Sequence, residues 1–189
     1  SKAPICCNGS IGSGQVMIAS IPTERFDLIP MTPAFLRASL EGYKSVLPAT
    51  QCARGGASTP AVVACGMALQ ATGVMVGYIG FRTAPNAEYL QPYVPGGVEN
   101  GLVVLPSFRR QGSAREAAVA LMRWALLAHG VTRFAMTIRP DNHPSQALAS
   151  QLGFVRIGSH IDEVDGLEDI LECRLSVEDI TKEDSEKLR

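Results

Sequence analysis

One segment of the chain combines two arginines, a glycine and small residues in an order that suits phosphate binding. Its residues are Arg109-Arg110-Gln111-Gly112-Ser113-Ala114, between an apolar run at 98–105 and a helical pattern at 113–129. The first turn of a helix leaves backbone N–H groups unpaired and carries about half a positive charge. Glycine lets the backbone approach a ligand closely, and arginines add charge. The segment therefore predicts a pyrophosphate-binding turn; an ordinary helix start with solvated arginines is the alternative.

Other glycine-rich phosphate motifs do not fit this chain. It has no G-x-x-x-x-G-K-[ST] P-loop, and the lone Gly112 excludes the nicotinamide fingerprint. A second glycine cluster, at Gly9, Gly12 and Gly14, follows no strand. A flexible leader explains that cluster better than a phosphate loop does.

Length and composition place the turn in one folded domain. The chain has 189 residues, of which 46% are hydrophobic, and its 17 basic and 18 acidic side chains leave a net charge of −1. A chain of this length buries a core without a metal or disulfide. The charge balance argues against nucleic-acid binding through phosphate neutralisation. No apolar run reaches about 18 residues and the N-terminus lacks a signal-peptide pattern, so no membrane partner is expected.

The cysteines and histidines show no metal-ligand spacing. The cysteines are odd in number and form no C-x-x-C pair: Cys6, Cys7, Cys52, Cys65 and Cys173. Such a set predicts reduced thiols rather than a disulfide framework. The sequence therefore predicts a cytoplasmic protein without a bound metal.

The order of the elements predicts one mixed α/β domain at 21–176, after a flexible leader at 1–20 and before a charged tail at 177–189. Apolar patterning predicts strands at 26–28, 61–69, 74–81, 98–105, 131–139, 154–164 and 167–175. Asp165-Gly166 is the expected two-residue hairpin turn of the last pair. The segments 48–60 and 83–97 read as loops, and the three prolines of the second predict mobility.

Three helices are expected between these strands. Thr32-Pro33 begins the first, which ends at Gly42, and the third spans 144–152 before Gly153. The second, at 113–129, has an apolar face made mostly of alanine and is followed by Gly130. Small side chains on that face predict close packing of the helix against the sheet.

Three motifs, in this order along the chain, resemble the GNAT N-acetyltransferases. Thr23-Glu24-Arg25-Phe26 resembles the T-E-R-L opening of the branch with the ribosomal-protein N-terminal acetyltransferases (RimJ/RimL-type), and the hairpin at 162–166 also fits that branch. Arg109-x-x-Gly112-x-Ala114 resembles the acetyl-CoA motif R/Q-x-x-G-x-G/A. Asn142-His143-Pro144-Ser145 followed by Leu152-Gly153-Phe154 resembles N-x-x-S…L-G-F. The resemblance covers residues 21–175.

The resemblance implies a mixed, mostly antiparallel sheet with a splayed central strand pair and helices on both faces. It implies acetyl-CoA as co-substrate and a primary amine as acceptor, on a protein N-terminus or a small molecule. The pantetheine arm is expected in the splay, against the backbone of Leu102, Val103, Val104 and Leu105. The expected pyrophosphate ligands are Arg109, Arg110, Gln111, Gly112, Ser113 and Ala114. Asn142 and Ser145 complete the expected cofactor set.

Direct attack of an amine on a thioester needs a base, and the leaving thiolate needs an acid. Glu99 lies where the family often presents a carboxylate, so it is the expected base; a surface glutamate on an edge strand is the alternative. Asn100 is a weaker polar candidate on the opposite face. Many relatives place a tyrosine acid seven residues after the motif asparagine, but this chain has Ala149 there. Ser145 is the remaining hydroxyl, either as the acid or only as a helix cap.

The closing hairpin carries a cluster of carboxylates: Asp162, Glu163, Asp165, Glu168, Asp169 and Glu172. They can attract a cationic amine or lie on a solvated strand face, and the sequence favours the solvated face. The resemblance also implies a homodimer as one assembly. The alternative function is a non-catalytic acyl-CoA-binding sensor, against which the presence of Glu99 and Ser145 argues.

Overall fold

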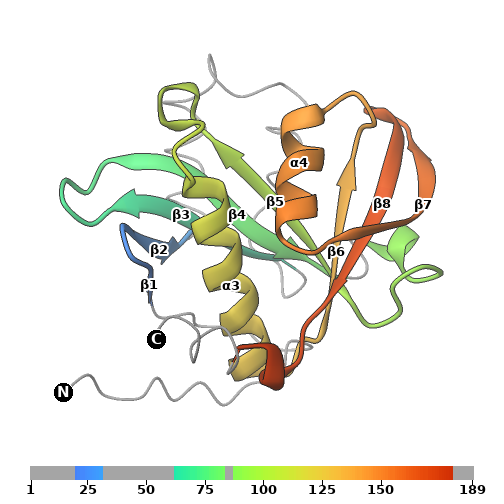
Figure 1. Cartoon of the computed structure of the whole chain (residues 1–189), viewed down its shortest axis with the longest axis horizontal. Helices are drawn as coiled ribbons and strands as arrows, with labels where there is room; N and C mark the ends of the chain where they lie inside the picture. The colour runs from blue at the N-terminus through green and yellow to red at the C-terminus, as the bar shows by residue number, and fades with distance from the viewer. Residues whose placement is uncertain (1–19, 32–61, 84–86, 181–189) are drawn as a thin grey trace.

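Eight strands form one sheet in the computed structural model, which describes residues 20–31, 62–83 and 87–180 (Figure 1). The strands are β1 Ile21–Pro22, β2 Phe26–Pro30, β3 Val62–Leu69, β4 Met75–Arg82, β5 Val98–Val104, β6 Arg133–Ile138, β7 Val155–Asp162 and β8 Gly166–Arg174. Their order across the sheet is β1-β2-β3-β4-β5-β6-β8-β7, and only β5 and β6 pair in parallel. The predicted mixed, mostly antiparallel α/β fold is confirmed. The predicted helix at 32–42, the loop at 48–60, the leader at 1–19 and the tail at 181–189 lie outside the described residues.

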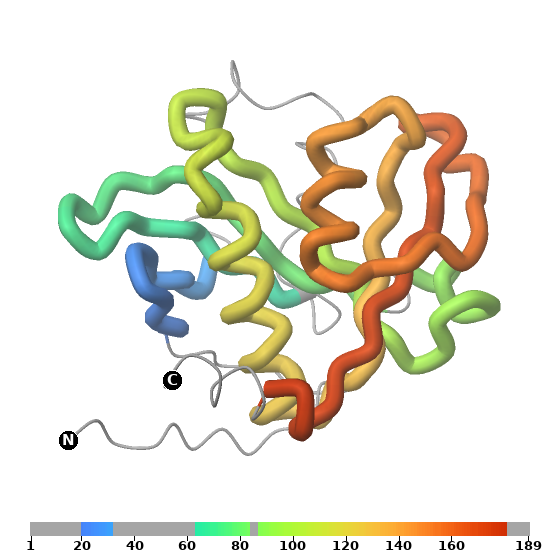
Figure 2. Tube along the Cα trace, viewed as in Figure 1, coloured from blue at the N-terminus to red at the C-terminus, as the bar shows by residue number. Residues whose placement is uncertain are grey.

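The longest helix, α3 Ser113–His129, has the bounds that the sequence predicts. Gly112 (φ 77°) precedes it and Gly130 (φ 66°) follows it, both in the left-handed conformation that favours glycine. Its alanine-rich face is fully buried at Ala117, Ala118 and Ala125. Small side chains there let the helix lie close to the sheet. Figure 2 shows the chain passing from β5 into α3 through a connecting segment, which contains the 3₁₀ helix η2 Pro106–Phe108.

The second α-helix, α4 His143–Gln151, follows β6 and is confirmed within one residue at each end. Ala149 of α4 is fully buried in the same core as Leu121 of α3, so both helices cover one face of the sheet (Figure 1). Phe81 and Phe134 contribute to this core from the sheet, with ring centroids 5.7 Å apart.

A second, smaller core contains Leu90 and Val94 together with Ala135 and Ile170 of the sheet. Leu90 ends the 3₁₀ helix η1 Glu88–Leu90, and both Leu90 (3%) and Val94 (1%) are almost completely buried. The prediction of a mobile loop at 83–97 is therefore wrong for its described part from residue 87 onward. The prolines suggested a loop, whereas the helical turn places two apolar side chains, four residues apart, against the sheet.

The hairpins follow the predicted order with one change in turn length. β3 and β4 are joined by a turn with Gly73 at φ 70°, as expected. Between β7 and β8, Asp162 pairs with Gly166, so the loop has three residues and the predicted two-residue turn at Asp165-Gly166 is wrong. The carboxylate of Asp162 accepts hydrogen bonds from the backbone N–H groups of Val164 (2.8 Å) and Asp165 (2.9 Å). These bonds stabilise a longer loop that ends at Gly166, at φ 76°.

The parallel pair at the centre of the sheet separates after a short contact. Its register consists of Val98 opposite Phe134 and Glu99 opposite Ala135. Beyond these pairs β5 continues beside β4 as far as Val104, and β6 continues beside β8 as far as Ile138. From Asn100 onward, the edge of β5 that faces β6 has no strand partner among the described residues. The predicted splayed central pair is confirmed.

Residues 177–180 are helical and lie at the predicted start of the tail. Ser176 Oγ and Asp179 Oδ2 cap this segment by bonding each other's backbone N–H groups at 3.3 and 2.8 Å. None of the helices within the described ranges is long and apolar enough to cross a membrane.

Candidate active site

The turn between β5 and α3 presents a helix start with no side-chain cap. Gly112 occupies the N-cap position at φ 77°, and no side chain in the described part of the chain caps the first N–H groups of α3. Uncapped N–H groups at the positive end of a helix dipole form an anion site. Arg110 and Gln111 are exposed beside them, whereas Ser113 is buried and Ala114 half-buried. The turn therefore fits the pyrophosphate site that the sequence predicts.

Two side chains hold the turn in place from within. Arg109 Nε donates to the carbonyl oxygen of Val104 at 2.9 Å, which ties the turn to the end of β5. Gln111 Nε2 donates to the carbonyl oxygen of Ser107 at 3.2 Å. Arg110 has φ 59°, an unusual value for a residue with a side chain. The bonds of Arg109 and Gln111 both run to backbone carbonyl oxygens on the inner side of the turn, so its exposed side is left open.

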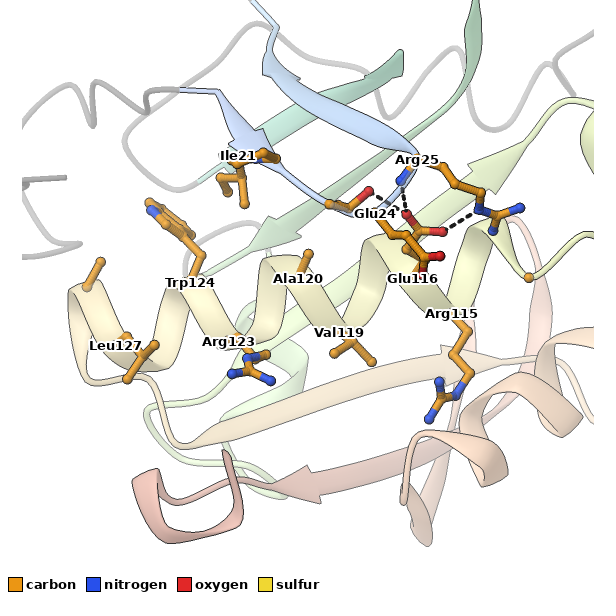
Figure 3. A pocket seen from close by; sticks show the side chains of 14 residues that line it. Ile21, Glu24, Arg25, Arg115, Glu116, Val119, Ala120, Arg123, Trp124 and Leu127 are labelled. Carbon is orange, nitrogen blue, oxygen red and sulfur yellow. Dashed lines mark hydrogen bonds and ion pairs between the residues drawn. The ribbon is translucent and has the colours of Figure 1, made fainter. Parts of the chain in front are cut away.

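The turn between β1 and β2 supports the same loop from outside (Figure 3). Arg25 Nε lies 2.7 Å from Glu116 Oε2, and the backbone N–H of Arg25 donates to Glu116 Oε1 at 2.7 Å. Thr23 Oγ1 donates to Glu116 Oε1 at 2.5 Å. Arg25 also donates through Nη1 to the carbonyl oxygen of Gln111 at 2.9 Å. Two residues of the T-E-R motif thus bond the first turn of α3 and the turn that precedes it.

A groove begins at Gly112 and runs along α3 on the side of this network (Figure 3). Arg115 and Arg123 line it from α3, and Ile21 and Trp124 line its far end. Burial disfavours the ionised form of Glu116, but the hydrogen bonds from Thr23 and Arg25 outweigh it and lower the pKa of this carboxyl. Glu116 therefore stays ionised and keeps its partners at neutral pH.

The residues expected to contact the pantetheine arm lie along the unpaired edge of β5. Leu102, Val103 and Val104 pair with β4 on one side only. Leu105 follows the strand and donates its N–H to the carbonyl oxygen of Val76 at 2.8 Å. Helix α3 begins at the open end of the splay because it follows β5 directly. Helix α4 follows β6 in the same way, so both helix starts lie toward that end (Figure 1).

The start of α4 differs in one detail from the expectation. Asn142, not Ser145, is the N-cap: its Oδ1 accepts the backbone N–H of Ser145 at 3.3 Å. The interpretation of Ser145 as the helix cap is therefore wrong, because Ser145 lies inside the first turn. Its side chain is half-buried. Ala149, at the position of the usual tyrosine, is fully buried and supplies no hydroxyl.

Glu99 is buried in the centre of the sheet, with 2% of its surface exposed, which excludes the alternative of a surface glutamate. Its Oε1 accepts hydrogen bonds from Tyr89 Oη and Thr137 Oγ1, each at 2.7 Å, and lies 2.8 Å from Arg82 Nη2. Its Oε2 is buried without a hydrogen-bond partner in the described part of the chain. All three polar contacts of the carboxylate are therefore made by one oxygen.

The partners of Glu99 stay in the ionisation states that these bonds require. Burial, followed by the neighbouring Glu99 carboxylate, raises the pKa of the Tyr89 phenol. Desolvation opposes the charge of Arg82, but Glu99 outweighs it and raises the pKa of the guanidinium. Tyr89 thus remains a neutral hydrogen-bond donor, and Arg82 remains a cation.

Two further polar groups extend this cluster. The rings of Tyr89 and His160 stack with centroids 4.4 Å apart. His160 Nε2 lies 3.2 Å from Glu168 Oε2, and Glu168 is only 6% exposed. The second core lies on the sheet face opposite α3, because Ala135 and Ile170 alternate along their strands with residues of the main core. Glu99 and Thr137 lie on that same face, since they are the register partners of Ala135 and Ile170. Tyr89 packs against this second core.

The prediction that the acidic hairpin is a solvated face is wrong for Glu168 and Glu172. Both are buried, at 6% and 7% exposure. Glu172 Oε1 lies 2.7 Å from Arg133 Nε and 3.1 Å from Arg174 Nε. These carboxylates point inward on alternate residues of β8 and are paired there, which the overall charge of the segment does not reveal.

A family model described as an acetyltransferase (GNAT) domain matches residues 24–155. The chain belongs to this GNAT family. Solved structures agree in fold: a GNAT-family acetyltransferase from Bordetella pertussis is 23% identical, with 82% of this chain and 99% of that chain covered and a TM-score of 0.67. An acetyltransferase from Salmonella typhimurium, which modifies the N-terminal serine of the 50S ribosomal subunit protein L7/L12, is 17% identical over 84% and 100% of the two chains, with a TM-score of 0.63.

A third GNAT structure was solved with coenzyme A. This ribosomal L7/L12 α-N-protein acetyltransferase, RimL, is 15% identical over 83% of this chain and 98% of that chain, with a TM-score of 0.61. No curated protein sequence matches the chain. Membership in the GNAT family makes the chain an N-acetyltransferase. Among residues 20–31, 62–83 and 87–180, no group of three or more His, Cys, Asp or Glu side chains could hold a metal ion.

Several residues of the cluster around Glu99 were not predicted from the sequence. Arg82, Tyr89, Thr137 and His160 come from three strands and the turn η1. The sequence did contain one signal for the contact between Arg82 and Glu99. Arg82 ends β4 and Glu99 lies near the start of β5, so their opposite charges become register partners when the two strands pair. The others depend on strand register, which single-sequence patterns do not fix.

Proposed function

We propose that this GNAT enzyme transfers the acetyl group of acetyl-CoA to a primary amine by direct attack in a ternary complex. One observation carries the proposal: Glu99 stands in the last residue pair before β5 and β6 separate. The expected donor channel and a buried carboxylate with a free oxygen therefore meet at one point of the sheet. That juxtaposition supports Glu99 as the proton acceptor beside the thioester end of the donor.

On the donor side, the uncapped start of α3 would receive the pyrophosphate, with Arg109, Arg110 and Gln111 around it. The unpaired edge of β5 from Leu102 to Leu105 offers backbone groups to the pantetheine arm. A backbone N–H near the closed end of the splay would stabilise the oxygen that gains charge during attack. Asn142 and Ser145 would border the arm from the start of α4.

On the acceptor side, Glu99 would take the proton of the attacking amine through Oε2. The charged groups Glu99, Glu168 and Arg82 leave this cluster with one net negative charge when His160 is neutral. A negative site favours an amine that arrives protonated. Ser145 is the proposed acid for the leaving thiolate, since Ala149 has no hydroxyl.

A protein N-terminus is the first acceptor to test, because two of the similar structures are acetyltransferases of the ribosomal protein L7/L12. Small-molecule amines are the second. We also propose a cytoplasmic location. We propose a homodimer as the assembly, which size measurements on the purified chain would test.

The experiment follows free thiol released from acetyl-CoA in the presence of an amine panel. A peptide with a free N-terminal serine is compared with the same peptide acetylated in advance, and a polyamine and an amino acid test small acceptors. Thiol release that requires a free amine supports the transferase. Binding of acetyl-CoA by calorimetry without thiol release from any amine would contradict it and support the non-catalytic sensor.

A further inference from the structure

Asn100 carries a buried side-chain amide that the described structure leaves unsatisfied. The residue is 5% exposed, yet neither Nδ2 nor Oδ1 has a hydrogen-bond partner among the described residues. Burying a donor and an acceptor without partners is unfavourable, and native proteins rarely leave both atoms of one amide in this state. The amide therefore points to a partner that binds from outside the chain.

The position of Asn100 indicates where that partner would lie. Glu99 is the last residue of β5 that pairs with β6, so Asn100 is the first residue at the closed end of the splay. Successive strand residues face opposite sides of a sheet. Val98 and Val104 pack in the main core under α3, and Asn100 shares their side, whereas Glu99 faces the other side. The Asn100 amide is thus separate from the Glu99 cluster.

A ligand that extends inward from the start of α3 would reach this amide. Val104, at the open end of the splay, is four residues from Asn100, a distance of roughly 13 Å along a strand. The first half of that path passes Leu102 and Val103, whose side chains are only half-buried. Asn100 therefore stands at the inner end of the channel in which the proposed function places the pantetheine arm.

We propose that the side chain of Asn100 hydrogen-bonds the secondary amides of the pantetheine arm of coenzyme A. The arm contains two such amides, so Oδ1 can accept from an N–H of the arm while Nδ2 donates to one of its carbonyl oxygens. A thioester offers only acceptors and would leave Oδ1 without a partner. The inference rests on the proposed function, because it takes acetyl-CoA as the ligand of the splay.

The test compares two ligands and three proteins by calorimetry. The ligands are coenzyme A and 3′-phosphoadenosine 5′-diphosphate, which has the same nucleotide but lacks the arm. Asn100→Leu should bind coenzyme A at least about tenfold more weakly, as expected for two lost hydrogen bonds, and bind the arm-free nucleotide as the wild type does. Val98→Ala is the matched control: it changes the same strand and face outside the splay, and it should leave both affinities unchanged.

A second readout separates binding from structure. Because Asn100→Leu removes an unsatisfied buried amide, the ligand-free variant should melt about 2–4 °C higher than the wild type. Unchanged affinity for coenzyme A, equal loss of affinity for both ligands, or a lower melting temperature would each overturn the proposal. Failure of the wild type to bind coenzyme A would instead overturn the proposed function.

A third experiment uses the wild-type protein and therefore does not depend on a stable variant. The side-chain N–H₂ resonances of Asn100 should shift on adding coenzyme A and stay in place on adding the arm-free nucleotide. If these resonances do not shift with coenzyme A, or shift equally with both ligands, the result would contradict a hydrogen bond between Asn100 and the pantetheine arm.

Discussion

Arg25 and Glu116, 91 positions apart in the sequence, join the turn after β1 to the first turn of α3 through an ion pair of 2.7 Å. The same guanidinium donates to the carbonyl oxygen of Gln111 in the phosphate turn. One side chain therefore links a strand turn, a helix start and the expected pyrophosphate site. The T-E-R sequence has a structural role here that does not require contact with substrate.

Arg25→Met should weaken acetyl-CoA binding several-fold, because the phosphate turn loses a bond that orients it. The stability loss should stay below about 1 kcal/mol, since 41% of the Arg25 side chain is exposed and solvent screens the ion pair. Calorimetry and urea unfolding measure the two effects. Arg156→Met is the control, because its ion pair with Asp169 is also exposed but joins β7 to β8. Equal affinity losses in both variants would remove Arg25 from the support of the site.

Gly112→Ala should reduce both stability and acetyl-CoA affinity, and Gly130→Ala should reduce stability alone. Both glycines have left-handed backbones, at φ 77° and 66°, one at each end of α3. A Cβ at either position costs about 1 kcal/mol of backbone strain. Only Gly112 lies at the expected pyrophosphate turn. Both variants should therefore melt at a lower temperature, but only Gly112→Ala should bind acetyl-CoA more weakly. Gly112→Trp should abolish binding, and retained affinity there would exclude the turn as the pyrophosphate site.

Glu99→Gln should lower kcat by roughly 10²-fold or more while the KM for acetyl-CoA changes little, as expected for loss of a general base. Steady-state thiol-release kinetics measure both values. Glu172→Gln is the control: it is also a buried carboxylate on the same face, but Arg133 and Arg174 hold it. A normal kcat in Glu99→Gln, or an equal fall in both variants, would show that Glu99 is not the base.

Acid should destabilise the fold through Glu172 and Glu116. Desolvation raises the pKa of Glu172, but the hydrogen bonds from Arg133 and Arg174 outweigh it and lower the pKa below its ordinary value of 4.5. A carboxyl with a lowered folded-state pKa stabilises the protein fully above the unfolded-state pKa, and this contribution is lost as the pH falls through the folded value. Urea unfolding between pH 7 and pH 3 should show a smaller drop in Glu172→Gln than in the wild type. Parallel curves would contradict the assignment.

Cys65 and Cys173 should resist alkylation in the folded protein. Burial raises the pKa of Cys65 to about 12 and that of Cys173 to about 11, so almost no thiolate forms at neutral pH. Iodoacetamide labelling followed by peptide mass spectrometry should modify both only after unfolding. Labelling of either one in the native protein at the rate of a free thiol would show that its site opens.

Elements with a clear period were predictable from the sequence, and polar pairings across strands were not. The alanine spacing of α3 and its flanking glycines gave both helix ends, since helix periodicity and left-handed glycines are local properties. Gly112 marked the turn before α3 for the same reason. The contacts of Glu99 with Tyr89 and Thr137 depend on which residues face each other across strands, and that register is a tertiary property.

Two errors share one physical cause. Local composition predicted a mobile loop around Leu90 and a solvated face around Glu168. Leu90 is buried against Ala135 and Ile170, which are distant from it in the sequence, and Glu168 is buried beside His160 of the neighbouring strand. The prolines and carboxylates of a segment indicate its local conformation and charge, but they do not show which other parts of the protein will bury it.

The short junction between β5 and β6 divides the sheet into a part with β1 to β5 and a part with β6, β8 and β7. Among the described strands, only Val98–Phe134 and Glu99–Ala135 join the two parts by strand pairing, although one core under α3 spans both. Beyond these pairs the inner edges of β5 and β6 have no ladder partner, so amide hydrogen exchange should be fast along both edges in the free enzyme. A ligand seated between them would slow that exchange on both sides at once, so coenzyme A would act as a cross-link between the two parts of the sheet.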